Sequence, residues 1–411
     1  MASQVSTQHP EYTRMSDQWK DLRDVVAGAR AVKDAGIRYL PRLKDQDDES
    51  YQAYKKRASW LGATWASIRG MKGMLLRKPP EIDAPESVKA YFTDVTMTGK
   101  SLYDLIDIIT DEMLTTKRPG ILVDYPQANT EGMTAAQAES LNMRPSLAFY
   151  PAESIINWKQ ERINNAYVLA MVVLTEDAPL PGNEFEHKCE THYRVLDLAS
   201  RKDEKTGDTA RVYRQRVFRI NDKKEDEQVG ADIYPLMNGK PLTEIPFILD
   251  PEVDEPPLGD LADLNLDHYR LSADLKHGLH FAGLPTPVVS GYTPENAGDK
   301  LYIGSASAWV FPDPQASATY LEVNGNFAGI SEEMTKTEER MAVIGARLLA
   351  TEKKDSETSQ TANIHRAGEA SVLSNIGQTV GIILTKALTI FSAWAGVEKP
   401  VTVEMNDEYL P

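Results

Sequence analysis

Asp274, His277 and His280 are spaced three residues apart, and this spacing could support metal chemistry. Side chains three apart lie on one side of a helix, and imidazole and carboxylate groups are common zinc ligands. The sequence gives no clear further ligand outside this helix. The favoured interpretation is therefore a polar helix face, with no metal and no cofactor. A hydrolase that uses these residues is kept as an alternative.

Other reactive residue types occur without a catalytic pattern. Cys189 is the single cysteine and lies in a charged stretch, HKCETH, which favours a surface cysteine over a thiol nucleophile. The carboxylates of Asp107–Glu112 have Ile106, Ile108 and Ile109 as neighbours, which indicates the outer face of an amphipathic helix. The sequence contains no Walker A loop, GxGxxG, HExxH or GxSxG motif. These observations predict a protein that is not an enzyme.

Composition limits how the chain can meet nucleic acid. It has 411 residues with a formal net charge of −16, whereas proteins that grip DNA over their whole surface are normally basic. The chain is thus either no DNA binder or one that lets DNA slide. A stretch at 376–397 approaches the length of a membrane span, but Lys386 near its centre would cost ~2.5–3.5 kcal/mol on insertion. A buried helix is the preferred interpretation, with no membrane partner.

Helices are predicted first, and a sheet follows them. Hydrophobic periodicity predicts helices from Asp17 to Ala35, from Glu49 to Leu76 and from Ser101 to Thr116. Four segments rich in β-branched and aromatic residues then predict a mostly antiparallel sheet. They are Ile121–Pro126, Val168–Leu174, His192–Leu198 and Arg211–Ile220. The fold class is α+β.

The last third is predicted to hold three long helices. The first covers Asp260–Phe281, with an apolar stripe of leucines, and a β-rich insertion follows it. The second covers Ile330–Ala350, where Ser331 can cap the start. The polar segment Thr351–Ala362 has no large apolar residue and predicts a solvated loop. The third helix, Asn363–Ala395, has apolar residues alternately three and four apart, which is typical of a packing seam between helices.

The order of these parts resembles the portal fold of tailed bacteriophages. The sequence also resembles one portal-like group, known mainly by a domain of unknown function. The resembling stretches are WKDLRDVVAG (Trp19–Gly28), AGIRYLPRL (Ala35–Leu43), YQAYKKRASW (Tyr51–Trp60), LLRKPPEI (Leu75–Ile82), RPGILVDYP (Arg118–Pro126), YPAESIINWK (Tyr150–Lys159), LNLDHYRLSADL (Leu264–Leu275) and RMAVIGARLL (Arg340–Leu349).

The resemblance implies a division of the chain. A wing of helices and sheet would cover 1–258, a first stem helix 259–282, a small β-rich clip 283–326 and a second stem helix 327–350. A tunnel loop would cover 351–362 and a long tunnel helix 363–399, with 400–411 as the extended start of a C-terminal region. Many portals continue into a helical crown, and this sequence stops in the extended segment NDEYLP.

The resemblance also implies a function. A portal is a ring, usually of twelve copies, at one capsid vertex, through which double-stranded DNA is packaged and ejected. Its expected partners are the terminase large subunit, a head–tail adaptor and a capsid or scaffolding protein. Its location would be the virion, with assembly in the host cytoplasm. Since terminase supplies the ATPase, the missing Walker motif fits. The alternative from another class is a head–tail adaptor or minor capsid protein.

Site residues follow from these positions. The DNA-channel candidates are Lys353, Lys354, Asp355, Thr358, Lys336 and Arg340. Trp309, Phe311 and Tyr320 are the clip residues expected to contact partners. The alternative for each is a place in the core of the small domain. The inter-helix packing candidates are Leu373, Ile376, Gly377, Val380, Gly381 and Ile383. We expect this seam to be exposed in one subunit and covered by a neighbour, so that the chain assembles into a closed ring.

Overall fold

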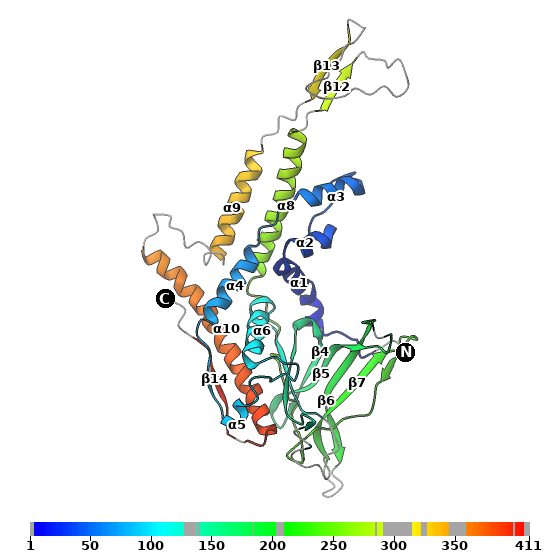
Figure 1. Cartoon of the computed structure of the whole chain (residues 1–411), viewed down its shortest axis with the longest axis vertical. Helices are drawn as coiled ribbons and strands as arrows, with labels where there is room; N and C mark the ends of the chain where they lie inside the picture. Colours follow the sequence, from blue (N-terminus) through cyan, green and yellow to red (C-terminus); the bar gives the residue numbers. More distant parts are fainter. Residues whose placement is uncertain are drawn as a thin grey trace.

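The chain is elongated, with a wide body at one end and a narrow shaft that rises from it (Figure 1). This computed structural model describes residues 4–126, 137, 140–183, 185–202, 209–283, 286–290, 315–321, 327–344, 359–397 and 399–406. The side chains of residues 202, 209, 286, 287, 320, 321 and 359–372 lie outside this description. Helices and sheets both build the described part, and the predicted α+β class is confirmed.

The N-terminal helices differ in their limits from those predicted. Helix α1 is Pro10–Ala27 and begins before Asp17, because the His9 side chain accepts the Glu11 N–H and Pro10 suits the first turn. Gly28, at φ 90°, separates α1 from α2, Ala29–Ala35, so the single predicted helix is two, and it ends at Ala35 as predicted, where Gly36 follows. A short 3-10 turn, Gly36–Arg38, follows.

The predicted helix from Glu49 to Leu76 is in fact two helices, α3 (Asp48–Arg57) and α4 (Ala63–Leu75). Asp47 caps α3, and the backbone turns at Ala58 to cross to α4. Short α5 is Glu86–Lys89, and α6 is Leu102–Thr115, close to its predicted limits. Ser101 and Asp104 form a capping box that fixes where α6 begins.

The body contains two main antiparallel sheets. Strands β4 (Ile155–Ile163), β5 (Ala166–Pro179), β6 (Cys189–Lys202), β7 (Thr209–Ile220) and β8 (Asp226–Gln228) form a five-stranded meander in chain order. The predicted antiparallel arrangement of its central strands is confirmed. A second sheet has the order β11 (Phe247–Ile248), β2 (Gly120–Asp124), β3 (Ser146–Tyr150), so the predicted first strand belongs to a different sheet from the others. The 3-10 turn η2, Ala152–Ser154, joins the two.

Two antiparallel helices form the shaft. Helix α8 is Gly259–Ala282, close to the prediction, and α9 is Ala328–Ile344. Helix α9 begins three residues before the predicted cap at Ser331. Beyond the outer ends of both helices lies a hairpin of β12 (Thr286–Ser290) and β13 (Ser317–Leu321), at the tip of the molecule in Figure 1.

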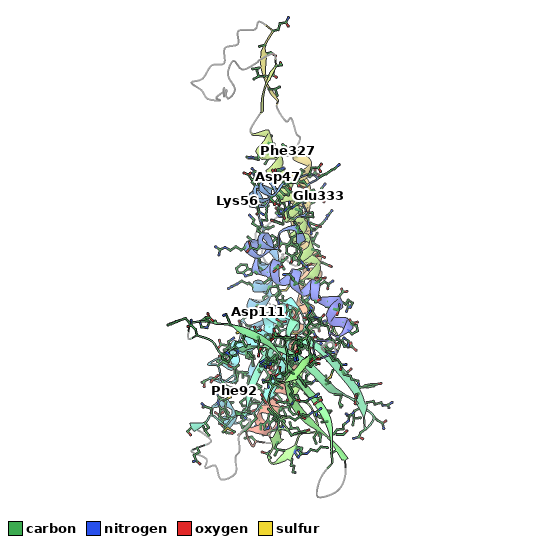
Figure 2. All side chains as sticks on the ribbon, turned by 90° about the vertical axis from the view of Figure 1, so that its right-hand side faces the viewer. Asp47, Lys56, Phe92, Asp111, Phe327 and Glu333 are labelled. Atoms are coloured by element: carbon green, nitrogen blue, oxygen red, sulfur yellow. The ribbon has the colours of Figure 1, made fainter. Side chains whose placement is uncertain are left out.

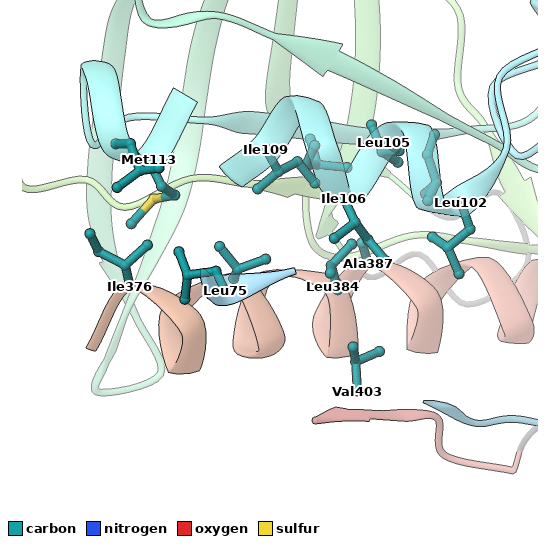
Figure 3. Packing of buried hydrophobic residues seen from close by; sticks show 14 of the residues in the cluster. Leu75, Leu102, Leu105, Ile106, Ile109, Met113, Ile376, Leu384, Ala387 and Val403 are labelled. Atoms are coloured by element: carbon teal, nitrogen blue, oxygen red, sulfur yellow. The ribbon is translucent and has the colours of Figure 1, made fainter. Parts of the chain in front are cut away.

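Helix α10, Ser359–Trp394, packs one face against the body and leaves the other exposed, where Ile382 is 55% exposed. It begins four residues before the predicted start, so 359–362 are helical where a loop was predicted. Figure 3 shows Leu102, Ile106 and Met113 of α6 facing it from one side, with Val403 on the other. Val403 belongs to β14 (Thr402–Glu404), which pairs with β1 (Glu81–Asp83); β9 (Leu236–Met237) and β10 (Lys240–Pro241) form another small ladder.

The packing seam of α10 is filled by its own subunit. Leu373, Ile376, Val380 and Gly381 are buried, while Ile383 is only partly buried because Leu384 takes the inward position. Gly377 is buried as well. The expectation that this seam is exposed in one subunit and covered by a neighbouring subunit is therefore wrong. Helix α10 is also the one described helix long and apolar enough to cross a membrane, over Leu373–Trp394, and half of that stretch is buried inside the protein.

Candidate functional site: the shaft

The described part of the shaft is held together by close packing and by a polar contact between its helices. The Phe327 ring lies against Gly278, where an added Cβ would be 2.3 Å from the ring. Farther along, Nε2 of the buried His268 lies 2.9 Å from Oε1 of Glu338. Figure 2 shows Phe327 and Glu333 along the upper shaft. Any side chain at Gly278 would push Phe327 away, so this glycine sets how closely α8 and α9 approach.

The opposite side of α8 is fixed by polar contacts with the N-terminal helices. Asn265 accepts hydrogen bonds from the N–H and hydroxyl of Thr64 and donates one to the Leu61 carbonyl at 2.6 Å. The Ser272 hydroxyl accepts the Ser59 N–H at 2.7 Å. The buried side therefore includes polar residues, and the predicted leucine stripe is only partly buried. The side of α8 that is buried against the N-terminal helices consists of Ala262, Asn265, Leu266, Tyr269, Ser272 and Ala273.

A groove of about 730 Å³ runs between α8 and α9 on one edge of the shaft. Its carboxylates are Asp260, Asp263, Asp267 and Glu339, its cations are Lys336 and Arg340, and its apolar residues are Leu264, Val343 and Ile344. We call this set the acidic groove. Burial raises the pKa of Asp263, and the neighbouring charges of Asp21, Asp260 and Asp267 raise it further. The groove therefore favours a cation over an anion.

The two predicted channel cations of the stem lie in this groove. Lys336 Nζ is 2.7 Å from Glu332 Oε1, and Arg340 is 3.4 Å from Glu333 Oε1. Each charge is thus offset by a glutamate of the same helix, and four carboxylates share the groove. Such surroundings favour a cationic or apolar partner at this edge over a DNA phosphate.

The remaining channel and clip candidates are placed only in part. Lys353, Lys354, Asp355 and Thr358 lie outside the described residues, as do Trp309 and Phe311. The backbone of Tyr320 lies in β13 opposite Pro287, in the register of the tip hairpin. Ser290 and Ser317 close the described end of this hairpin with their hydroxyls 3.0 Å apart.

The residues that suggested metal chemistry have other contacts. Asp274 accepts a hydrogen bond from the Tyr54 hydroxyl, and the His277 ring meets Phe281 edge to face at 4.7 Å. Burial lowers the pKa of His277, and the charges of Arg57 and His280 add to this effect. Within the described ranges, no three His, Cys, Asp or Glu side chains gather as a metal site. Cys189 is exposed at the start of β6.

The carboxylates of Asp107–Glu112 do not all lie on the outside of α6. Asp107 and Asp111 each lie 2.6 Å from Nζ of Lys72, while Glu112 is 3% exposed. Arg23 of α1 donates to Glu112 and to Glu153, joining α1, α6 and η2. The interpretation of this motif as an outer helix face was wrong for Glu112, because α1 covers that side of α6.

Sequence reasoning also missed the exposed face of α4. Trp65 is 47% exposed, and the Arg69 guanidinium lies over its ring at 5.0 Å from the centroid. The spacing of four residues was a signal that could have found this pair. Trp65 and Arg69 were placed in a single predicted helix, Glu49–Leu76. The apolar pattern of that long helix did not separate an exposed face from a buried one.

A comparison with protein families finds a match for the last third of the chain. Residues 257–395, which comprise the shaft and α10, match a family model described as "Domain of unknown function (DUF4055)". The predicted resemblance to a group known by a domain of unknown function is confirmed over this range. No curated protein matches the chain.

Solved structures similar to this chain come from gene transfer agent (GTA) particles. The neck of an empty particle, computed with C6 symmetry, has 12% identity and a TM-score of 0.42, over 90% of this chain and 86% of that chain. A native virion has 10% identity and a TM-score of 0.43, and a native neck computed with C12 symmetry has 10% and 0.41; both cover 92% of this chain and 90% of theirs.

Proposed function

We propose that this chain is a portal subunit of a tailed bacteriophage, a virion structural protein that forms a ring around the path of DNA. One observation carries the proposal. An α+β body leads into two antiparallel helices that carry a small β-hairpin at their far end, and a long helix then packs back against the body. This order is the one that the resemblance assigns to wing, stem, clip, stem and tunnel helix.

The proposed partners follow from this arrangement. The tip hairpin projects from the shaft, so it is available to the terminase large subunit during packaging and to a head–tail adaptor afterwards. The body would contact the capsid or a scaffolding protein at one vertex, after assembly in the host cytoplasm. DNA would pass through the ring without chemistry by this chain, in keeping with its net charge of −16.

The first test is the shape of the assembly. Purified full-length chain is expected to form closed rings, about twelve subunits each, with a central hole in negative-stain electron microscopy. Head-to-tail contacts that close generate rings, which is the symmetry that a DNA conduit requires. Mass photometry at micromolar concentration should give a single species at the ring mass. A folded monomer or dimer under these conditions contradicts the proposal.

A different virion protein, such as an adaptor or minor capsid subunit, is the second candidate, and a hydrolase is the third. An adaptor ring would bind a preformed portal and would not support packaging with terminase alone. If the chain were a hydrolase, the monomeric protein would hydrolyse a test ester. The packing of Asp274 and His277 against Tyr54 and Phe281 disfavours the hydrolase.

We further propose that Lys353 and Lys354 meet DNA phosphates during translocation, with Asp355 and Thr358 beside them. The double variant Lys353→Glu/Lys354→Glu should assemble normally and reduce packaging or retention of DNA, because repulsion replaces two transient phosphate contacts. The defect should shrink as salt rises, since added ions screen exposed charges. A DNA-protection assay at low and high salt measures this. Packaging equal to the parent at both salt concentrations excludes the assignment.

A further inference from the structure

The outer face of α4 exposes residue types that are common at the centres of protein interfaces. Leu61 is 38% exposed and Trp65 47% exposed, and Arg69 stacks on the Trp65 ring. The contact that the structure describes for the Arg69 guanidinium is this stacking on Trp65. Tryptophan and arginine dominate binding energy when a partner covers them. Trp65 and Arg69, with Leu61 just before the helix, are called the α4 face below.

The α4 face and the acidic groove lie on opposite edges of α8. Asn265 holds the start of α4 through Thr64 and Leu61, so it marks the edge that α4 covers. Asp263 and Asp267 lie two residues before and after Asn265. At 3.6 residues per turn, two residues correspond to about 200°, so both carboxylates point nearly away from Asn265.

The start of α4 lies at the height of these two aspartates along the shaft, because Asn265 holds it through Thr64 and Leu61. Two residues of helix correspond to a rise of only about 3 Å between Asn265 and either Asp263 or Asp267. Copies that meet through these surfaces are therefore side by side, with little displacement along the shaft. Repeated contacts of this kind close into a flat ring, whereas a large displacement would produce a helical filament.

The chemistry of the two surfaces is complementary. Val343 and Ile344 are 57% and 45% exposed in the acidic groove, so an indole ring would bury apolar surface there. A guanidinium would sit among the carboxylates whose mutual repulsion helps to raise the pKa of Asp263. The groove volume of about 730 Å³ leaves room for an indole ring and a guanidinium.

We propose that the α4 face of one copy docks into the acidic groove of a second copy of this chain, with Trp65 against Val343 and Ile344 and Arg69 beside Asp263. The inference rests on the proposed ring, for which it names the contact between neighbouring subunits. The contact is head-to-tail, so each copy offers one surface to each neighbour.

A charge swap tests the pairing. Arg69→Glu and Asp263→Lys should each raise the protein concentration at half-assembly at least about tenfold, because each places like charges together. The double variant Arg69→Glu/Asp263→Lys should return to within about threefold of the wild-type value. Arg162→Glu, the same change at an exposed position at the end of β4, is the control and should assemble as wild type. Analytical ultracentrifugation measures assembly, and circular dichroism checks the fold.

A cross-link provides a second measurement that does not depend on weakened assembly. In a Cys189→Ser background, Trp65→Cys and Val343→Cys chains are mixed and oxidised. Disulfide-linked dimers should form in the mixture, because position 65 of one copy meets position 343 of the next. They should not form in either variant alone, because each variant carries only one of these two cysteines.

The outcomes separate this inference from the proposed function. If wild type forms rings while both single charge variants assemble as wild type, the docking contact is overturned and the ring stands. A double variant as defective as the singles overturns the pairing, as does a mixture without cross-linked dimers. A folded wild-type chain that stays monomeric overturns both proposals.

Discussion

Arg23→Ala is expected to lower the free energy of unfolding by roughly 3–5 kcal/mol, because it leaves the buried carboxylate of Glu112 without its cation. Arg23 Nη2 lies 2.8 Å from both oxygens of Glu112 and 2.9 Å from Glu153. Among the described residues, Glu112 would keep the Thr116 hydroxyl and the Ala152 N–H. Urea unfolding at one fixed protein concentration measures the change.

Two variants separate the buried pair from a general effect of losing an arginine on α1. Arg14→Ala removes an ion pair with Glu11 on the same helix, but both side chains are nearly half exposed, so less than about 1 kcal/mol should be lost. Arg23→Ala/Glu112→Gln should recover at least about half of the loss, since a neutral amide needs no cation. Equal destabilisation by Arg23→Ala and Arg14→Ala would contradict the role of this pair.

The same network predicts a change in acid stability. Burial would raise the pKa of Glu153, but the hydrogen bond and charge of Arg23 outweigh it, and the pKa is lowered. A lowered folded-state pKa stabilises the fold above the unfolded-state pKa, and this contribution is lost as pH falls through the folded-state value. Arg23→Ala should therefore lose less stability than wild type over that acid interval, which unfolding curves at successive pH values would show.

Gly381→Val should destabilise the body by about 1–3 kcal/mol, because α10 and β14 touch backbone to backbone at this residue. A Cβ at Gly381 would lie 2.9 Å from the Val403 carbonyl oxygen, a contact that cannot be relieved by a side-chain rotation. One turn farther along α10, the Thr385 hydroxyl accepts the Val403 N–H at 3.0 Å. The substitution therefore strains β14 at the point where it is anchored, and the midpoint of urea unfolding should fall.

Gly73→Val is the matched control for this prediction. Gly73 also lies inside a helix, α4, but a Cβ there meets no atom within 4 Å. Valine should be near neutral or slightly stabilising at Gly73, because it is the better helix former of the two residues. If the two valine substitutions changed stability equally, the close approach of β14 would not be what requires glycine at position 381.

The sequence by itself determined the elements whose signals are local. The capping box at Ser101 set the start of α6, and Gly36 set the end of α2. The β-branched runs of β5, β6 and β7 indicated an antiparallel sheet, and the apolar period of α10 marked most of its buried side. Each of these signals depends on backbone conformation or on one face of one element, so neighbouring residues are enough to reveal it.

Only the tertiary structure decided what covers each face. Periodicity showed that α10 has a seam but could not show that α6 and β14 fill it within one subunit. Glu112 was predicted to be exposed, and α1 buries it because Arg23 arrives from 89 residues away in the chain. The edge of the shaft opposite the α4 face is acidic because α8 and α9 pack side by side. Such pairings join residues distant in sequence, and they depend on packing and desolvation that no local pattern records.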